Sequence, residues 1–537
     1  MKTVRWYVLA LLVLGLSMGL VLVAGAQPQA GGSLIMGIGE EPDTLDPNET
    51  NRFHSLVVLN YVVEPLFALN EDYEAVPLLI SGFEWSEDKL TMIVHLKEGI
   101  TFHNGEEMTS EDVKASYERY FRLSPLANYL PPEKGGVIEI DTPDDYTVIF
   151  RFERPKPLAL FYMADAHIAI MPAEWLATTP DEEVGVKSLI GTGPFQLVKW
   201  VRGDRIVMKR FEDYDHGPDF ISNKGPAYIE DLVMRIVPED ATMVAEIMAG
   251  NIDFTFDVPL SAYKQLTATP NVQILSAPTF SIQYLVCNME RAPFVDKQVR
   301  MAIAHAVNKE EIAKAAWFGV GAPLYGLVGP ATTGYWKGMN YIAYPNDLDK
   351  ARAYLDAAGW VDSDGNGIRD KDGKALRLTL ITFSNIDQWK RAAEIVQAQL
   401  AKVGIKVDIE LAEVGATYDR AEAADYDLGI FRNTWWMGVP YLTFLTHSDN
   451  VHSSNFGQLE NDALDTMLLL ASEELDDNLR REAFYAAQII VVESAVWIPL
   501  VANVNVIAAK PSVGGLDELF SHPWQPPIMR ALVLYKQ

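Results

Sequence analysis

The chain of 537 residues carries 73 Asp and Glu residues against 44 Lys and Arg residues, which gives a formal net charge of −29. An acidic chain of this kind is repelled by phosphate backbones and anionic lipid headgroups, which argues against nucleic-acid binding. Hydrophobic residues make up 49% of the sequence, enough for several cores, and the length corresponds to roughly three to four domains or subdomains.

The start of the chain has the layout of a secretory signal peptide. Lys2 and Arg5 give a positive beginning, residues 6–23 carry no charge, and Ala24-Gly25-Ala26 places small residues where a signal peptidase cuts. We predict that residues 1–26 are removed and that the mature protein is exported, soluble, and periplasmic or extracytoplasmic. A retained membrane anchor is the alternative, because the uncharged run nearly reaches the length that spans a bilayer.

The single cysteine, Cys287, has two consequences for the mature protein. It lies far from the cleavage site, so the mature N-terminus has no lipidation cysteine, and it has no partner for an intramolecular disulfide. Its apolar neighbours predict a buried, unreactive thiol on a strand.

Strand and helix signals alternate along the first part of the chain. A short apolar run predicts a buried strand at 34–38, and further patterns predict strands at 91–96 and 146–152. Between the last two strands, Thr109 is placed to cap a helix, with Asp112 at the third helical position.

The second part of the chain is richer in helices. Helices are predicted, in chain order, at 297–307, in the stretch that begins after a cap at Asn308, at 347–358 and at 387–403. A strand at 405–411, two packed helices within 461–493 and a returning strand pair at 496–509 follow. Gly359 and Gly404 end two of these helices, because glycine adopts the conformation that the position after a helix requires. Without an internal repeat or a low-complexity linker, these mixed elements predict one large α/β body.

Common motifs of enzymatic chemistry are absent from the sequence. There is no His-Glu-x-x-His pair, no Cys-x-x-Cys and no Gly-x-Ser-x-Gly elbow, so the usual zinc frameworks and the α/β-hydrolase nucleophile are missing. His447, Asp449 and His452 lie close together, and we interpret them as a solvated loop rather than a metal site. We predict no catalytic residue and no cofactor, and keep a secreted hydrolase only as the alternative from another functional class.

One segment resembles a calcium-binding loop. Its ligand positions 1, 3, 5 and 9 are Asp362, Asp364, Asn366 and Asp370, with Gly367 at position 6. The twelfth position, where a bidentate glutamate is expected, is Gly373. We therefore favour a surface turn between a helix and a strand, and predict no metal site.

Several short motifs follow one another in a recognisable order. They are EPDTLDP at 41–47, EPLF at 64–67, FHNGE at 102–106, TSEDV at 109–113, GTGPF at 191–195, GNID at 250–253, and VRMAI at 299–303 with AVNK at 306–309. Over roughly 34–510 the chain thereby resembles extracellular solute-binding protein family 5 of ABC importers, which includes dipeptide-, oligopeptide- and nickel-binding proteins. The resemblance implies a substrate-binding protein rather than an enzyme.

The resemblance also implies an α/β fold of the large periplasmic-binding-protein class, with two lobes of mixed sheets flanked by helices. Lobe one would comprise a core at 31–62, 191–277 and 505–537 and an extra subdomain at 63–190, and lobe two would take 278–504. A hinge would let the lobes close over a small-molecule ligand, and membrane permease subunits would recognise the closed form. We expect a monomer.

The ligand contacts that the resemblance implies lie in two stretches. In peptide-binding members an Asp of lobe two, just after a Trp, pairs with the peptide ammonium, but that position falls on or near Met437 here. Moreover, the chain has no carboxylate between Asp427 and Asp449. A buried ammonium without a counter-charge is costly, so this sequence departs from the usual peptide mode.

Two ligand classes follow from these stretches. The candidate contacts are Asn51, Phe53 and His54 in lobe one, and Arg432, Asn433, Trp435, Trp436 and Met437 in lobe two. An oligopeptide is the family's commonest ligand, whereas two adjacent tryptophans beside Asn433 could stack on the rings of an oligosaccharide. A metal complex or another solute is a further alternative.

Overall fold

The computed structural model describes residues 28, 30–70, 73–125, 127, 129–435, 437–516 and 531–536. The predicted signal peptide at 1–26 lies outside these residues, as does Trp436. Across the described residues, no helix combines the length and the apolar character that a membrane crossing requires.

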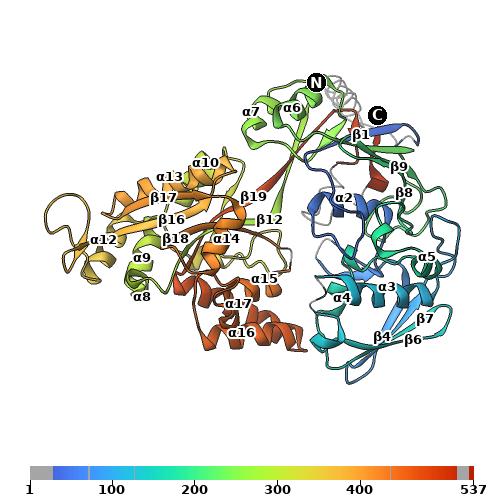
Figure 1. The fold of residues 1–537 in the computed structure, drawn as a ribbon, viewed down its shortest axis with the longest axis horizontal. Helices are drawn as coiled ribbons and strands as arrows, with labels where there is room; N and C mark the ends of the chain where they lie inside the picture. Colours follow the sequence, from blue (N-terminus) through green and yellow to red (C-terminus); the bar gives the residue numbers. More distant parts are fainter. Residues whose placement is uncertain are drawn as a thin grey trace, which may run out of the picture.

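Two lobes lie side by side and share one sheet (Figure 1). Its strands are, in spatial order, β17 (Lys406–Ala412), β16 (Arg377–Phe383), β18 (Leu428–Thr434), β12 (Gln273–Cys287), β19 (Trp497–Ala509), β11 (Phe254–Thr255), β1 (Ser33–Ile38), β10 (Asp231–Ile236), β9 (Arg205–Arg210) and β8 (Phe195–Val201), with β13 (Ala322–Pro323) paired to β19. The sheet can extend through both lobes because β12 has 15 residues and β19 has 13.

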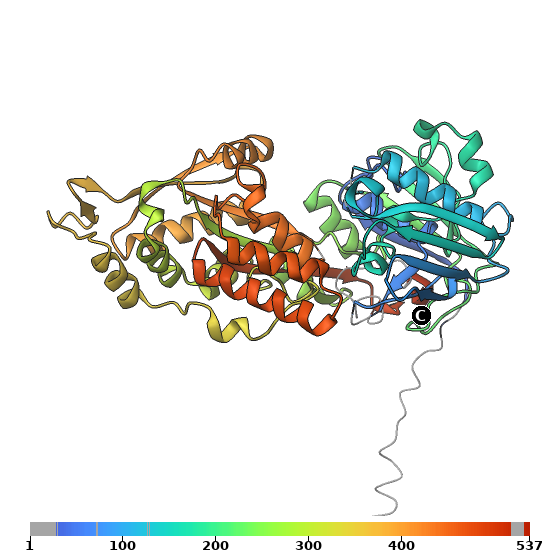
Figure 2. The ribbon, with the colours of Figure 1, turned by 90° about the horizontal axis from the view of Figure 1, so that it is seen from below.

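β12 and β19 are the segments that cross between the lobes. They pair antiparallel, and their register shifts between Pro278 and Ile282 and again after Gln283. An irregularity of this kind bends a strand pair locally. It separates Leu275, which packs against the core of lobe one, from Ile282, which belongs to the core of lobe two, on the strands that run between the lobes (Figures 1 and 2). The boundaries that we expect at 277/278 and 504/505 fall within these two strands.

Lobe one combines a core and a subdomain. The core strands β1 and β8 to β11 are accompanied by helices α2 (Phe53–Val62), α6 (Asp240–Ala249) and α7 (Tyr263–Thr267). The subdomain contains an antiparallel sheet in the order β4 (Ile80–Trp85), β5 (Thr91–Leu96), β7 (Thr147–Phe152) and β6 (Val137–Asp144), with helices α3 (Ser110–Leu123), α4 (Ala159–Tyr162) and α5 (Ala173–Thr178). Across both lobes, the described residues also form three small two-stranded sheets: β2 (Phe67–Leu69) with β3 (Ala75–Pro77), β14 (Asp370–Lys371) with β15 (Lys374–Ala375), and β20 (Val513–Gly514) with β21 (Tyr535–Lys536).

Lobe two surrounds its part of the shared sheet with helices. These are α8 (Ala292–Val295), α9 (Lys297–Ala306), α10 (Lys309–Ala316), α11 (Met339–Ile342), α12 (Leu348–Ala357), α13 (Asp387–Ala401), α14 (Val414–Glu422), α15 (Gly438–Thr446), α16 (Asp462–Glu473) and α17 (Asp477–Ser494). α16 and α17 pack together, and one end of the pair faces lobe one (Figure 2).

Two of the sequence motifs meet inside lobe one, where they fix the scaffold. The buried carboxylate of Glu64 accepts hydrogen bonds from Thr192 Oγ1, Tyr214 Oη and His216 Nε2, each at 2.8 Å. Such partners are what a buried carboxylate needs to be tolerated. A Cβ atom on Gly191 would lie 2.2 Å from the carbonyl oxygen of Val62, so glycine is required where this motif packs against the end of α2.

Most of the predicted elements are confirmed. β1, β5 and β7 occupy the three predicted strand positions, α3 begins after Thr109, and α9, α12, α13, α16 and α17 occupy the predicted helical stretches. Asn308 caps α10 by accepting a hydrogen bond from the Glu311 amide at 2.8 Å. The strand pair at 496–509 is wrong: the segment is one strand, β19, because its whole length pairs with the equally long β12.

The prediction for Cys287 is also confirmed. The residue is fully buried on β12, and burial raises the pKa of its thiol to about 12. A thiol with so high a pKa holds almost no thiolate near neutral pH, which makes it a poor nucleophile.

Candidate ligand-binding cleft between the lobes

A cavity of about 880 Å³ lies between the subdomain of lobe one and the helices of lobe two. The subdomain contributes residues of the segments 129–135 and 153–162, and lobe two contributes Trp435, parts of α15, Asn450 and the end of α16. Because both lobes supply its walls, a relative movement of the lobes changes its shape. We call this space the interlobe cavity.

A second cavity of about 420 Å³ adjoins the first. The two share Leu158, Val439 and Pro440, and the second is also lined by Tyr73 and Met437. Shared walls make the two spaces parts of one cleft, which is large enough for a ligand of several residues or rings.

The lobe-one wall is built on a pair of stacked tyrosines. The rings of Tyr129 and Tyr162 lie 4.3 Å apart and 6° from parallel, and the Tyr129 hydroxyl accepts a hydrogen bond from the Leu158 amide at 3.2 Å. The ammonium of Lys156 lies 4.3 Å from the centre of the Tyr129 ring. Burial raises the pKa of Tyr129 to about 12, so this wall presents neutral aromatic surface beside a cation.

The lobe-two wall is formed largely by the end of β18 and by α15. Trp435 follows β18, packs against the apolar cores of both lobes and meets Phe444 edge-on at 5.5 Å. Met437 is 4% exposed and packs with the lobe-one core. The structure therefore brings two of the predicted contact residues, Trp435 and Met437, into the cleft.

The other predicted lobe-two residues lie differently. Arg432 is exposed and its guanidinium lies 5.2 Å from the ring centre of Trp389. Asn433 accepts a hydrogen bond from the amide of Thr434 at 3.0 Å. Neither residue lines the two cavities described above, so in this arrangement they do not join Trp435 in one wall.

The predicted lobe-one residues are engaged at the start of α2. His54 is buried and its Nε2 lies 2.8 Å from Asp257 Oδ2, and Phe53 meets Phe256 edge-on at 5.7 Å. These contacts tie α2 to the segment after β11, whereas Asn51 is exposed. None of the predicted three lines the two cavities, and their role as ligand contacts stays a prediction.

Charged groups of both signs line the interlobe cavity. Lobe one supplies the exposed Glu133 and Glu153 together with Arg154 and the buried Lys156, and lobe two supplies Glu473. Arg154 Nη1 lies 3.4 Å from Glu473 Oε1, which forms an ion pair between the lobes. Burial, and then the charge of Arg154, lower the pKa of Lys156 to about 8.

Sequence reasoning missed this charged wall. It lies in the subdomain, which the expected contacts did not include, and the only local signal is the run Glu153-Arg154-Pro155-Lys156-Pro157. Charged residues between prolines usually indicate an exposed turn, and the fold alone places this turn opposite α15 and α16.

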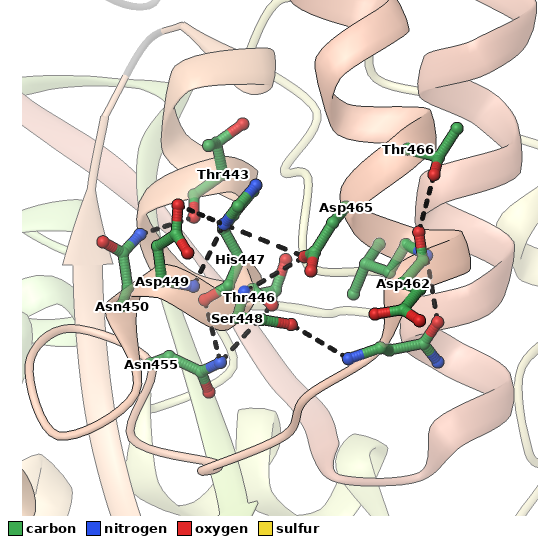
Figure 3. Close-up of polar contacts among 12 residues, drawn as sticks. Thr443, Thr446, His447, Ser448, Asp449, Asn450, Asn455, Asp462, Asp465 and Thr466 are labelled. Carbon is green, nitrogen blue, oxygen red and sulfur yellow. Dashed lines mark hydrogen bonds and ion pairs between the residues drawn. The ribbon is translucent and has the colours of Figure 1, made fainter.

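The polar loop that follows α15 borders the cavity through Asn450 (Figure 3). Within it, His447 Nδ1 lies 3.7 Å from Asp449 Oδ2 and 3.9 Å from Asp465 Oδ1, and Asn450 Nδ2 donates to the Thr443 carbonyl at 3.0 Å. His452 points elsewhere, because its Nε2 lies 3.1 Å from Glu290 Oε1. The loop is held by contacts within itself and to α15 and α16.

In the calcium-like loop, the side chains at the candidate ligand positions form hydrogen bonds within the loop. Asp362 accepts from the Gly367 amide at 3.0 Å, Asp364 and Asn366 hydrogen-bond each other, and Asp370 accepts from Ser363. Over the described ranges no group of three or more His, Cys, Asp or Glu side chains is arranged to hold a metal ion. The segment forms an exposed turn before β16.

Comparison with known proteins agrees with this architecture. A family model described as bacterial extracellular solute-binding proteins, family 5 Middle, matches residues 74–455, more than half of the chain. The oligopeptide-binding protein AppA of Bacillus subtilis (strain 168) is 28% identical over 440 residues, which are 80% of this chain and 78% of AppA. The glutathione-binding protein GsiB of Salmonella typhimurium is 25% identical over 511 residues, 93% of this chain and 94% of GsiB.

Solved structures show the same fold. The ABC transporter substrate-binding protein CtaP of Listeria monocytogenes superimposes with a TM-score of 0.82 at 22% identity, over 95% of this chain and 100% of CtaP. AppA in complex with a nonapeptide superimposes with a TM-score of 0.72 at 24% identity, over 95% and 100%. The predicted two-lobed periplasmic-binding-protein fold is confirmed, and the chain belongs to the bacterial extracellular solute-binding proteins of family 5.

Proposed function

We propose that this protein is the substrate-binding component of an ABC importer and captures an oligopeptide in the cleft between its lobes. The observation that carries the proposal is the interlobe cavity, whose walls come from both lobes and combine aromatic surface with charges of both signs. A peptide carries an ammonium, a carboxylate and amide groups, and this lining has a partner for each of them.

The relatives support the same ligand class. AppA is named for oligopeptide binding and GsiB for glutathione, which is itself a small peptide. The lobe-two carboxylate expected for the peptide ammonium is missing, but Glu133, Glu153 and Glu473 line the cavity instead. An acidic side chain from outside the expected stretch can therefore reach a bound amine.

An oligosaccharide is the ligand that a screen must distinguish. Trp435, Phe444 and the two stacked tyrosines offer ring surfaces for sugars, but a neutral sugar leaves the buried ammonium of Lys156 without a counter-charge. We therefore favour the peptide.

A ligand screen by thermal unfolding tests the proposal. Peptides of two to nine residues and cello- and xylo-oligosaccharides would each be added to the full-length mature protein. A ligand at 100 times its Kd adds about 2.7 kcal/mol to the free energy of unfolding. A rise in Tm with peptides alone supports the proposal, and a rise with sugars alone overturns the ligand class.

Trp435→Ala is the matching site variant. Because Trp435 lies between the lobes and lines the cavity, we expect its removal to weaken peptide binding about 10- to 100-fold, the effect of losing a buried aromatic contact. Isothermal titration would measure it. Trp175→Ala, in the lobe-one subdomain but not among the cavity-lining residues, is the control, and equal losses in the two variants would contradict a direct contact.

We further propose that binding involves lobe closure without chemical change of the ligand. The crossing strands with their register shift at 278–282 provide the bending point, and the ligand must favour the closed arrangement by a few kcal/mol to populate it. Small-angle X-ray scattering should show a smaller radius of gyration with saturating peptide. Recovery of the intact peptide after incubation excludes hydrolysis.

Export and delivery to a permease complete the proposal. The layout of residues 1–26 supports export through a signal peptide, and mass spectrometry of the secreted protein would locate the cut after Ala26. A start of the mature chain at Met1 would instead support the membrane anchor.

A further inference from the structure

The interlobe cavity contains a buried cation that lacks a counter-charge. Lys156 is 7% exposed, although it lines a cavity that both lobes border. In the described part of the chain no carboxylate lies within ion-pair distance of its ammonium. Its recorded contacts are one hydrogen bond to the Lys134 carbonyl at 2.6 Å and the Tyr129 ring.

The carboxylates near Lys156 compensate its charge only in part: burial and Arg154 lower its pKa more than Glu473 and Glu153 raise it. Glu133 and Glu153 line the same cavity but are exposed, where water screens their charge. Glu473 lies 3.4 Å from Arg154 across the lobes, with about half of each side chain exposed. The carboxylates that line the cavity are thus exposed to solvent, whereas Lys156 is buried.

We propose that Lys156 binds an anionic group of the ligand, so that the protein selects peptides with a carboxylate directed at the lobe-one subdomain. The inference rests on the proposed peptide-binding function and adds a specificity-determining residue to it. An ammonium has three donors, one of which is used by the Lys134 carbonyl, and the others can reach a carboxylate in the cavity. A charge-assisted hydrogen bond in a partly buried site is stronger than a neutral one.

The proposal assigns recognition of a ligand charge to lobe one, whereas the family resemblance implies a charged contact from lobe two. The lobe-two stretch 428–448 carries no acidic residue, so it cannot hold a ligand ammonium by charge. The subdomain segments at 133–135 and 153–156 instead carry charges of both signs. Recognition of the ligand carboxylate is therefore assigned to lobe one, and the aromatic side chains of Trp435 and Phe444 cover the ligand from lobe two.

The carboxylate has two sources in a peptide, the C-terminus and an acidic side chain. Matched probes separate them: di- to nonapeptides without acidic side chains as free acids, the same peptides as C-terminal amides, and amides that carry one glutamate. Isothermal titration of the full-length mature protein would give a Kd for each. We expect free acids to bind about 10- to 100-fold more tightly than amides, as for a hydrogen bond to a charged group.

Two variants show whether Lys156 produces this preference. Lys156→Met keeps most of the side chain's volume without the charge, and should bind free acids and amides with equal affinity. Lys156→Arg keeps the charge and should retain the preference in part. Lys187→Met is the matched control, because Lys187 lies in the same subdomain with 67% of its side chain exposed and pairs with Glu183.

The outcomes separate the two proposals. If the glutamate-bearing amides recover the affinity of free acids, the acidic side chain can supply the anion; if they do not, the C-terminus supplies it, and either result supports the role of Lys156. If neither the free acids nor the glutamate-bearing amides bind the unaltered protein more tightly than the plain amides, or if Lys156→Met lowers the affinity for acids and amides alike, Lys156 is only structural and the inference fails while peptide binding stands. If no peptide binds the unaltered protein, both proposals fail.

Discussion

Two buried lysines, Lys156 and Lys309, show how differently one kind of side chain is used in this molecule. Burial lowers the pKa of each to about 8. Lys156 lines the interlobe cavity and donates a hydrogen bond to a backbone carbonyl. Lys309 begins α10 inside lobe two, is 2% exposed, and its ammonium has no hydrogen-bond partner in the described part of the chain.

Burial of a lysine ammonium by itself therefore does not indicate a binding residue. Both ammonium groups lie near a tyrosine ring, at 4.3 Å for Lys156 and 5.2 Å for Lys309, and such a contact compensates only part of the loss of water. The distinguishing feature is free volume beside the cation, which Lys156 has and which lets a ligand supply the missing charge. Lys309 therefore only lowers stability, whereas Lys156 can increase affinity.

Replacement of Lys309 should change the stability of the protein more than any other substitution considered for this contrast. Lys309→Met should raise the free energy of unfolding at pH 7 by about 2 to 3 kcal/mol, because a lowered folded-state pKa means that burying the charged form is costly. The cost is fully present below pH 8 and fades as the pH rises toward 10.5, the ordinary lysine value. Denaturant unfolding at pH 7 and pH 10 would measure both.

Lys314→Met is the control for this substitution. Lys314 lies on the same helix and is exposed, so its loss should change the free energy of unfolding by less than about 0.5 kcal/mol. Equal stability of the Lys309→Met variant and the unaltered protein would mean that the buried ammonium is compensated, and the comparison between the two lysines would then collapse.

The affinity for free-acid peptides should depend on pH through Lys156. A bound carboxylate raises the pKa of Lys156, so above its free value of about 8 binding takes up a proton, and affinity for free-acid peptides should fall about tenfold between pH 7 and pH 9. Below pH 8 the lysine is charged with or without ligand, and affinity should be level. Isothermal titration in buffers of different ionisation enthalpy would detect the proton uptake.

Neighbouring groups bear on that pH profile. The charged and titratable side chains around the Lys156 ammonium are Tyr129, Glu133, Lys134, Glu153, Arg154, Tyr162 and Glu473. The same titration on Lys156→Met isolates the lysine, because all these neighbours are retained. A fall in affinity that persists in the variant would assign the titration to one of them or to the α-amino group of the peptide, whose ordinary pKa of about 8 lies in the same range.

Loss of the ion pair between the lobes should change the stability of the protein least. Arg154→Met should change the free energy of unfolding by less than about 1 kcal/mol, since both Arg154 and Glu473 are about half exposed and such pairs contribute little. A loss of several kcal/mol would instead make this pair a principal contact between the lobes.

Local signals in the sequence predicted most individual elements of the fold. Thr109 with Asp112, Asn308 with Glu311, and Gly404 after α13 each act within a few residues, so their structural meaning can be read from the chain itself. The order of the family motifs then predicted two lobes. β19 was misread as a strand pair because its length is set by its partner β12, 210 or more residues away along the chain.

The cleft was predicted less completely than the fold. Trp435 and Met437 were expected from the resemblance and do line the cavities, whereas His54 and Arg432 hold contacts elsewhere. Lys156 was not expected, because nothing within a few residues of it distinguishes a ligand-facing lysine from a solvated one. Lys156 differs from a solvated lysine because it is buried and lines a cavity that lobe two also borders.

The elements, the turns and the membership of a two-lobed family can thus be predicted from local patterns, because caps, glycines and apolar periodicity depend on neighbours along the chain. The three-dimensional arrangement is needed to see which side chains face the ligand space, how long the crossing strands run, and which buried cation has no ion pair. Those properties depend on segments that meet across two lobes, and their free energies come from burial and distance, which no local pattern of residues contains.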